Sequence, residues 1–216
     1  METVALIDYG SGNIRSVQKA LQRASRESGL STAVIVTSDA QQVASADRLV
    51  LPGVGAFRAC YQGLVALPGM MDALDEAVRL KARPFLGVCV GMQLLATRGH
   101  EYGLSAGLGL IAGDVLPLSA RAGVISGGLR VPHMGWNDVS FVGGQDLGDR
   151  PDEAFYFAHS FYFDVESDED VIAVCDYGGP LPVGVQRGNV MGFQFHPEKS
   201  QGAGIALLAA FLRWRP

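Results

Sequence analysis

The stretch FLGVCVGMQ, residues 85–93, does most to define the fold of this chain. Its apolar run at 85–88 predicts a buried strand, and the residues from Gly91 to Thr97 predict a helix that begins at once. A strand that turns directly into a helix is the building unit of a parallel sheet with helices on both faces. The stretch therefore predicts an α/β fold.

The same unit recurs on the N-terminal side of this stretch and gives way to a different pattern on the C-terminal side. Apolar runs and helical spacing predict the earlier strands 3–7, 33–37 and 48–51 and the helices 14–24 and 71–80. A glycine-rich region at 99–130 contains one strand-like run at 113–118. Beyond that region, closely spaced runs predict antiparallel strands near 137–141, 154–157, 171–175, 183–186 and 190–195, before a helix at 205–212. We expect one domain over residues 1–216, an α/β fold whose mostly parallel central sheet is flanked by helices and carries an added antiparallel section.

Composition excludes several classes of protein. Hydrophobic residues make up 48% of the 216 residues, which excludes a disordered chain. The net charge is −5 with only 17 Lys and Arg, so we expect no nucleic acid as a partner. There is no apolar run of the roughly 18 residues that a membrane span needs. The three cysteines form no C-x-x-C pair and the first residues do not resemble a signal peptide, so we expect a cytoplasmic protein without a disulfide framework.

Cys89 has the surroundings of a nucleophile. Gly87 and Gly91 flank it where the predicted strand turns into the helix, and such a turn holds a side chain at the carboxyl end of the sheet. The N-terminus of the helix favours the negative thiolate, and the N–H of Val90 can stabilise an oxyanion. The alternative is a buried structural cysteine, which we assign to Cys60 and Cys175.

A histidine and a carboxylate follow the last predicted strand. In QFHPE, residues 194–198, Pro197 disfavours a helical backbone at His196. Side chains two residues apart in an extended segment lie on the same side, so Glu198 can reach the imidazole. Alone, this triplet is equally typical of an exposed turn. With Cys89 it predicts a nucleophile, a base and a residue that orients the base.

Two other patterns fail as cofactor or metal sites. The glycines of GSG at 10–12 suggest a dinucleotide fingerprint, but Arg15 stands where the third glycine is needed. His133 and His159 have no carboxylate or cysteine at ligand spacing, so structural roles fit them better than metal binding. We expect no metal and no cofactor.

Seven stretches together carry a family resemblance. They are DYGSGN (8–13), PGVG (52–55), GVCVGMQ (87–93), PHMGWN (132–137), HSFY (159–162), HPE (196–198) and EKSQ (198–201). Over nearly its whole length the chain resembles the class I glutamine amidotransferases, and within them most closely the glutaminase subunits of imidazole glycerol phosphate synthase. The sequence departs from the family pattern at two positions, since Val90 stands where Leu is usual and Ser11 where Met is common. Both departures are mild, because neither removes a functional group.

The resemblance implies a flavodoxin-like architecture, glutamine as the substrate and a role for each residue of the motifs. Cys89 would attack the carboxamide of glutamine, His196 would transfer protons and Glu198 would hold the imidazole in one tautomer. The oxyanion would be stabilised by the backbone at Gly53, Val54, Gly55 and Val90. The amino-acid end of glutamine would be recognised by Gln93, Ser160 and Phe161. Without the resemblance, Gln93 would be interpreted as a solvated helix residue and Ser160 as a strand-edge hydroxyl.

The resemblance also implies a partner. Ammonia would pass to a (β/α)₈-barrel cyclase subunit in a heterodimer that serves histidine biosynthesis, with Trp136 and Lys199 as interface candidates. A half-buried aromatic side chain and a solvated charge are the alternatives for these two residues. Two other functions stay open, a glutaminase for anthranilate, aminodeoxychorismate or pyridoxal phosphate synthesis, and a catalytically idle scaffold. The stretches 132–137 and 159–162 argue against the first of these.

Overall fold

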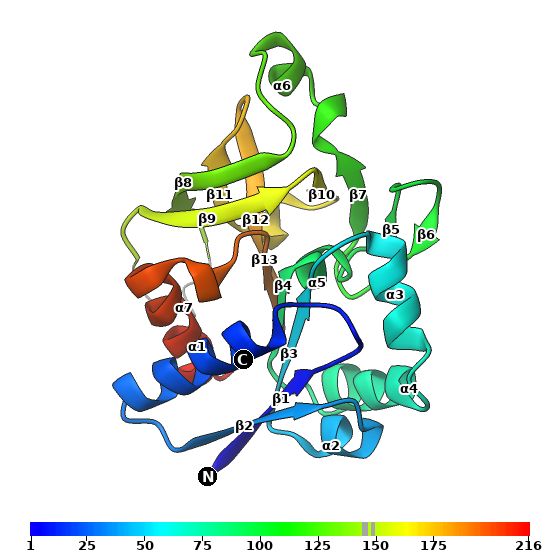
Figure 1. The fold of residues 1–216 in the computed structure, drawn as a ribbon, viewed down its shortest axis with the longest axis vertical. Helices are drawn as coiled ribbons and strands as arrows, with labels where there is room; N and C mark the ends of the chain where they lie inside the picture. Colours follow the sequence, from blue (N-terminus) through cyan, green and yellow to red (C-terminus); the bar gives the residue numbers. More distant parts are fainter. Residues whose placement is uncertain (144–146, 148–149) are drawn as a thin grey trace.

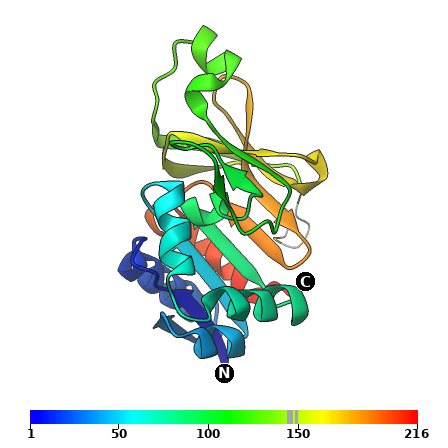
Figure 2. The same ribbon diagram turned by 90° about the vertical axis from the view of Figure 1, so that its right-hand side faces the viewer.

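The computed structural model describes residues 1–143, 147 and 150–216, and this part of the chain forms two sheets. The larger sheet has nine strands in the order β2-β1-β3-β4-β13-β12-β11-β8-β9. The smaller has four, in the order β10-β7-β5-β6. Figures 1 and 2 show a lower layered region and an upper region built mainly from strands.

The lower region, which we call the parallel half, contains the five parallel strands of the large sheet. These are β1 (Glu2–Ile7), β2 (Thr32–Thr37), β3 (Arg48–Gly53), β4 (Phe85–Cys89) and β13 (Val190–Phe193). Helices α1 (Ile14–Glu27) and α7 (Gln201–Arg213) lie on one side of them, and α2 (Ala40–Ser45), α3 (Phe57–Val65) and α4 (Met70–Leu74) on the other (Figure 1). The central strands β3 and β4 are buried along their whole length, as expected for strands covered on both faces.

The upper region, which we call the antiparallel half, continues the large sheet and adds the small one. Its large-sheet strands are β12 (Pro180–Arg187), β11 (Val171–Asp176), β8 (His133–Phe141) and β9 (Glu153–His159). The small sheet is formed by β10 (Phe161–Val165), β7 (Gly113–Pro117), β5 (Arg98–Gly99) and β6 (Ser105–Ala106), and α6 (Ala122–Ser126) projects above it (Figure 1).

The α/β fold and the antiparallel extension are confirmed, and the predicted strands all lie within observed ones or overlap them. The helix predicted at 91–97 is wrong in length, because α5 covers only Val90–Gln93. The carbonyl groups of Leu94, Leu95 and Ala96 accept hydrogen bonds from the N–H groups of the 108–111 segment. The chain therefore leaves the helix after one turn. The sequence patterns did not indicate α2, α3, α6, β5, β6, β10 or the small sheet.

One edge of the parallel half faces the antiparallel half. The carboxyl ends of β1, β3, β4 and β13 meet at this edge, since the strands are parallel. In open α/β sheets, ligands bind at the carboxyl ends of the strands. The antiparallel half stands above that edge and closes it on one side (Figure 2). Within the described residues, no helix is long and apolar enough to cross a membrane.

Candidate active site

Cys89 is the last residue of β4 and directly precedes α5, at the turn from strand to helix. Its backbone has φ 54° and ψ −113°, a positive φ that residues with side chains rarely adopt. The turn is tight: a Cβ atom on Gly91 would lie 1.8 Å from the carbonyl oxygen of Leu51. A strained residue between a strand and a helix is the geometry of a nucleophile elbow, which presents the side chain at the carboxyl edge of the sheet.

His196 and Glu198 follow β13, the neighbour of β4 in the sheet. The Nδ1 atom of His196 lies 2.9 Å from Oε1 of Glu198, and both side chains are almost fully buried. The predicted pair is present, but the predicted reason is wrong. His196 has an extended backbone, whereas Glu198 lies in a 3₁₀ turn at Pro197–Lys199 that brings its side chain back to the ring.

Ser200 anchors the segment that carries His196. Its hydroxyl donates to the carbonyl of His196 at 2.7 Å and accepts the N–H of Tyr156 on β9 at 3.0 Å. The N–H of His196 also donates to the carbonyl of Tyr156, at 2.9 Å. The imidazole is therefore held against β9 by backbone and hydroxyl bonds together. Ser200 belongs to the EKSQ stretch, but the sequence assigned it no role; a serine just before a helix normally suggests a cap, which this side chain does not form.

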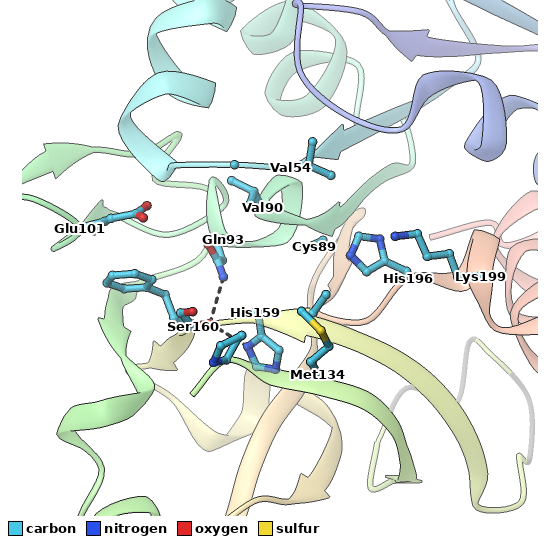
Figure 3. Close-up of a pocket in the computed structure, with 14 residues that line it drawn as sticks. Val54, Cys89, Val90, Gln93, Glu101, Met134, His159, Ser160, His196 and Lys199 are labelled. Carbon is cyan, nitrogen blue, oxygen red and sulfur yellow. Dashed lines mark hydrogen bonds between the residues drawn. The ribbon is translucent and has the colours of Figure 1, made fainter. Parts of the chain in front are cut away.

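The charge on His196 depends on its two neighbours. Burial disfavours the imidazolium and would lower the pKa of His196, but hydrogen bonding to Cys89 and Glu198 outweighs burial and raises that pKa to about 9. His196 therefore carries a proton at neutral pH, next to the thiol (Figure 3). A thiolate beside an imidazolium is the activated state of a cysteine nucleophile, and protonated His196 supplies the imidazolium.

A cleft of about 350 Å³ opens above these side chains, and both halves of the molecule line it. Figure 3 shows Cys89 and His196 at one end and Glu101 at the other, with Gln93 between them. The predicted residues that line the cleft are Val54, Gly55, Cys89, Val90, Gln93, Ser160, Phe161, His196 and Lys199. Three predicted residues do not line it. Gly53 packs behind the elbow, Glu198 lies behind His196, and Trp136 lies in a separate, more open groove of about 710 Å³.

Two polar residues of the site were not predicted. Glu101 lines the cleft and accepts the N–H of Phe57 at 2.7 Å. Gln194 is fully buried; its Nε2 lies 3.7 Å from Sγ of Cys89, and its Oε1 accepts from Nε2 of Gln93 at 2.9 Å. An amide inside the apolar run around β13 is a signal that could have indicated Gln194. Glu101 lies in an irregular, glycine-rich segment that offers no such signal.

The loop after β3 is held in place by residues of other elements. The carbonyl of Val54 accepts from the hydroxyl of Ser11 at 2.5 Å and from the thiol of Cys60 at 3.4 Å. The hydroxyl of Tyr9 donates to the carbonyl of Pro52 at 2.7 Å. The loop is thus fixed beside the elbow, where its backbone amides can face a negative oxygen. Within the described residues, no three His, Cys, Asp or Glu side chains are grouped so as to hold a metal ion.

Comparison with known families gives one match over nearly the whole chain. Residues 5–213 match the family described as glutamine amidotransferase class-I. The protein named imidazole glycerol phosphate synthase subunit HisH from Brucella suis biovar 1 (strain 1330) is 51% identical over 219 residues, which cover 99% of each chain. Proteins of the same name from Rhodospirillum rubrum and Caulobacter vibrioides are each 50% identical, and cover 99% and 100% of both chains.

Solved structures show the same fold at lower identity. A crystal structure described as a glutamine amidotransferase has a TM-score of 0.71 at 22% identity and covers 95% of this chain and 98% of its own. A glutamine amidotransferase from Thermotoga maritima has a TM-score of 0.63 at 17% identity and covers 98% of this chain and 96% of its own. At these identities the likeness establishes the fold alone.

Proposed function

The chain belongs to the class-I glutamine amidotransferase family, and on that premise we propose that it is the glutaminase subunit of an imidazole glycerol phosphate synthase. The observation that carries the proposal is identity of about 50% over whole chains to proteins named as that subunit. The Cys89–His196–Glu198 arrangement supports it, because these groups suit hydrolysis of an amide through a thioester.

The reaction begins with addition of the Cys89 thiolate to the γ-carbonyl carbon of glutamine, which pushes the carbonyl electrons onto oxygen. Backbone N–H groups of the 53–55 loop and of Val90 stabilise that oxygen. As the C–N bond breaks, the imidazolium of His196 donates its proton to the departing nitrogen, which leaves as ammonia. Glu198 holds the ring in position through Nδ1.

The second half of the reaction releases glutamate. Water attacks the thioester carbon while neutral His196 accepts one of its protons. The C–S bond then breaks, the electrons return to sulfur, and the thiolate–imidazolium pair forms again. No cofactor takes part in either half of the reaction.

Glutamine would lie along the cleft with its carboxamide at Cys89. Its α-ammonium group would then reach the opposite end, where the Glu101 carboxylate and the amide oxygen of Gln93 can accept hydrogen bonds. Its carboxylate would be bound by the backbone of Ser160 and Phe161, which lines the same wall. The free thiols of Cys60, Cys89 and Cys175 fit an enzyme that works in the reducing cytoplasm.

The ammonia would be consumed by a (β/α)₈-barrel cyclase bound as a heterodimer, which forms imidazole glycerol phosphate and an aminoimidazole carboxamide ribotide. Met134 and Trp136 support a partner surface near the cleft, since 64% and 50% of their surfaces are exposed on β8. Trp136 and Lys199 both contact the ring of Tyr156, the first edge-on at 6.1 Å and the second through its ammonium at 5.6 Å.

The test is co-purification with a candidate barrel cyclase, followed by glutamine hydrolysis and cyclisation assays. We expect hydrolysis to be slow for the lone subunit, faster in the complex and fastest when the cyclase ligand is bound. Glutamine should also drive cyclisation in the complex. A complex that forms but cyclises only with added ammonium salt would contradict the proposal.

A further inference from the structure

Two buried histidines meet in the wall of the antiparallel half, outside the catalytic groups. His133 on β8 and His159 on β9 are register partners in the sheet, and Nδ1 of His133 lies 2.9 Å from Nε2 of His159. They are only 4% and 5% exposed. The ring of His133 is stacked between Phe157 and Tyr177, with centroids 4.5 and 4.0 Å away.

The partners of the two rings determine where their protons lie. Nδ1 of His159 is 2.8 Å from the carbonyl of Phe161, which can only accept, so this nitrogen carries a hydrogen. At the other end, Oδ1 of Asn137 accepts the N–H of Asp138, so the amide nitrogen faces Nε2 of His133 at 3.3 Å. That nitrogen must therefore accept, which leaves the hydrogen of His133 on Nδ1, pointing at His159.

The hydrogen bonds that link Asn137, His133, His159 and the carbonyl of Phe161 form a row. All of them are satisfied only when both rings are neutral. A proton added to Nε2 of either ring would face another donor, Asn137 for His133 and His133 for His159. Burial lowers the pKa of His133 to about 4 and that of His159 to about 3, and the nearby charge of His196 contributes to lowering the latter. Tyr177 and Arg130, which line the same groove as His133, add no negative charge to offset the burial.

The row of hydrogen bonds ends at the carbonyl oxygen of Phe161, a residue that lines the proposed glutamine pocket. The carbonyl of Phe161 accepts from His159 and also from Nε2 of Gln93, at 3.1 Å. The second hydrogen of that amide donates to Gln194, whose own amide contacts Cys89 (Figure 3 shows Gln93 directed at this wall). The amide oxygen of Gln93 takes part in none of these bonds, so its orientation depends on where the Phe161 carbonyl lies.

We propose that His133 and His159 act as positioning residues, a neutral pair with hydrogens on both Nδ1 atoms that fixes the Phe161 carbonyl and, through it, the Gln93 carboxamide that binds glutamine. The inference rests on the proposed function, because it assigns the pair to substrate binding. Three hydrogen bonds, made by Asn137, His133 and His159, also connect the glutamine pocket with β8, the surface strand that carries Trp136.

The first test compares two replacements of His159 in the subunit bound to its cyclase. His159→Asn keeps an amide N–H near the position of Nδ1, whereas His159→Leu keeps bulk and loses the donor. We expect His159→Leu to raise KM for glutamine about tenfold, as for one lost hydrogen bond, with kcat nearly unchanged. His159→Asn should restore most of the affinity. His100→Leu, a replacement of the partly exposed histidine paired with Asp114, is the control and should leave KM unchanged.

Equal KM values for His159→Leu and His159→Asn, or a loss confined to kcat, would overturn the positioning role. A second test needs no variant. Long-range ¹H–¹⁵N spectra of the wild-type protein should show neutral, Nδ1-protonated rings for both histidines from about pH 5 to about pH 8, although the pKa of an unperturbed histidine is about 6.5. An Nε2–H tautomer or titration near that value would refute the pair. Correct tautomers in a complex that hydrolyses no glutamine would instead refute the proposed function.

Discussion

The two halves of the molecule position their functional groups by different means. In the parallel half, Cys89 and His196 are placed by the backbone, since Cys89 ends β4 and His196 follows β13. These two strands are neighbours, with Phe193 opposite Val88. In the antiparallel half, His133 and His159 are placed by a row of side-chain hydrogen bonds. Under the proposed function, this difference implies a division of roles, with the chemistry on the parallel half and substrate and partner binding mainly on the other.

This comparison predicts that substitutions in the two halves impair different properties of the protein. A change at the elbow or at the triad should remove hydrolysis and leave the partner bound. A change on β8 should weaken partner binding and leave the reactivity of the thiol unaltered.

The largest effect is expected for Cys89→Ala. Loss of the nucleophile should reduce glutamine hydrolysis by more than about 10⁴-fold, because the members of a triad act as a unit. His196→Ala should have nearly the same effect. The cyclase complex of Cys89→Ala should still form product from ammonium salt at high pH, where free ammonia is available. Steady-state assays with the two nitrogen sources make the measurement, and loss of the ammonia-dependent reaction would show that Cys89 also supports the partner.

The next largest loss of activity is expected for Gly53→Ala, because a side chain at this position separates the loop after β3 from the elbow at Cys89. A Cβ atom there would lie 2.7 Å from the backbone nitrogen of Gly91 and 2.9 Å from Cβ of Val90. The loop and the elbow must move apart, which misplaces the amides that face the oxyanion. We expect kcat to fall about 10²–10³-fold, as for loss of an oxyanion donor.

The matched control for that prediction is Gly202→Ala on α7, where a Cβ atom would meet nothing within 4 Å. Alkylation of Cys89 by a glutamine-like diazo-ketone measures whether the nucleophile survives in Gly53→Ala. Wild-type kcat in Gly53→Ala would contradict the assignment of this loop to the oxyanion.

The same comparison explains what could be predicted from the sequence. Cys89 and the HPE triplet lie at strand ends, and parallel pairing alone brings such ends together, so local patterns were sufficient to suggest the site. The contact between His133 and His159 depends on the register of β8 against β9, which no local pattern specifies. Glu101 reaches the cleft from an irregular segment, and β10 leaves the large sheet directly after β9. Both depend on long-range packing.

Glu198→Gln should have a smaller effect, with a signature in the pH profile. We expect kcat/KM to fall about 10²-fold, because the ring keeps a hydrogen-bond acceptor but loses a negative charge. In the wild type, hydrolysis should decline as the pH rises through about 9, where His196 loses the proton that it donates to ammonia. Without the carboxylate the pKa of His196 is lower, so this decline should begin at a lower pH.

The same proton also contributes to stability. Since the pKa of His196 in the fold lies above its usual 6.5, the stabilisation is fully present below that pH and is lost as the pH rises through about 9. Thermal melting across this range should show a smaller loss for Glu198→Gln than for the wild type. An unchanged alkaline limb in the variant would contradict the role of Glu198 in setting the charge on His196.

The smallest effect is expected for Trp136→Ala, and it belongs to the antiparallel half. The indole is half exposed and packs edge-on against Tyr156, so its removal creates no buried cavity and the fold should persist. A central aromatic residue of an interface typically contributes about 2 kcal/mol or more, which corresponds to about a 30-fold weaker Kd for the cyclase.

Leu80→Ala is the control, because Leu80 is 76% exposed just before the amino end of β4, at the opposite edge of the sheet. Titration calorimetry measures Kd, and diazo-ketone labelling of Cys89 reports on the nucleophile. Weaker binding with unchanged labelling would support separate roles for the two halves, whereas a parallel loss of both would show that β8 also shapes the catalytic groups.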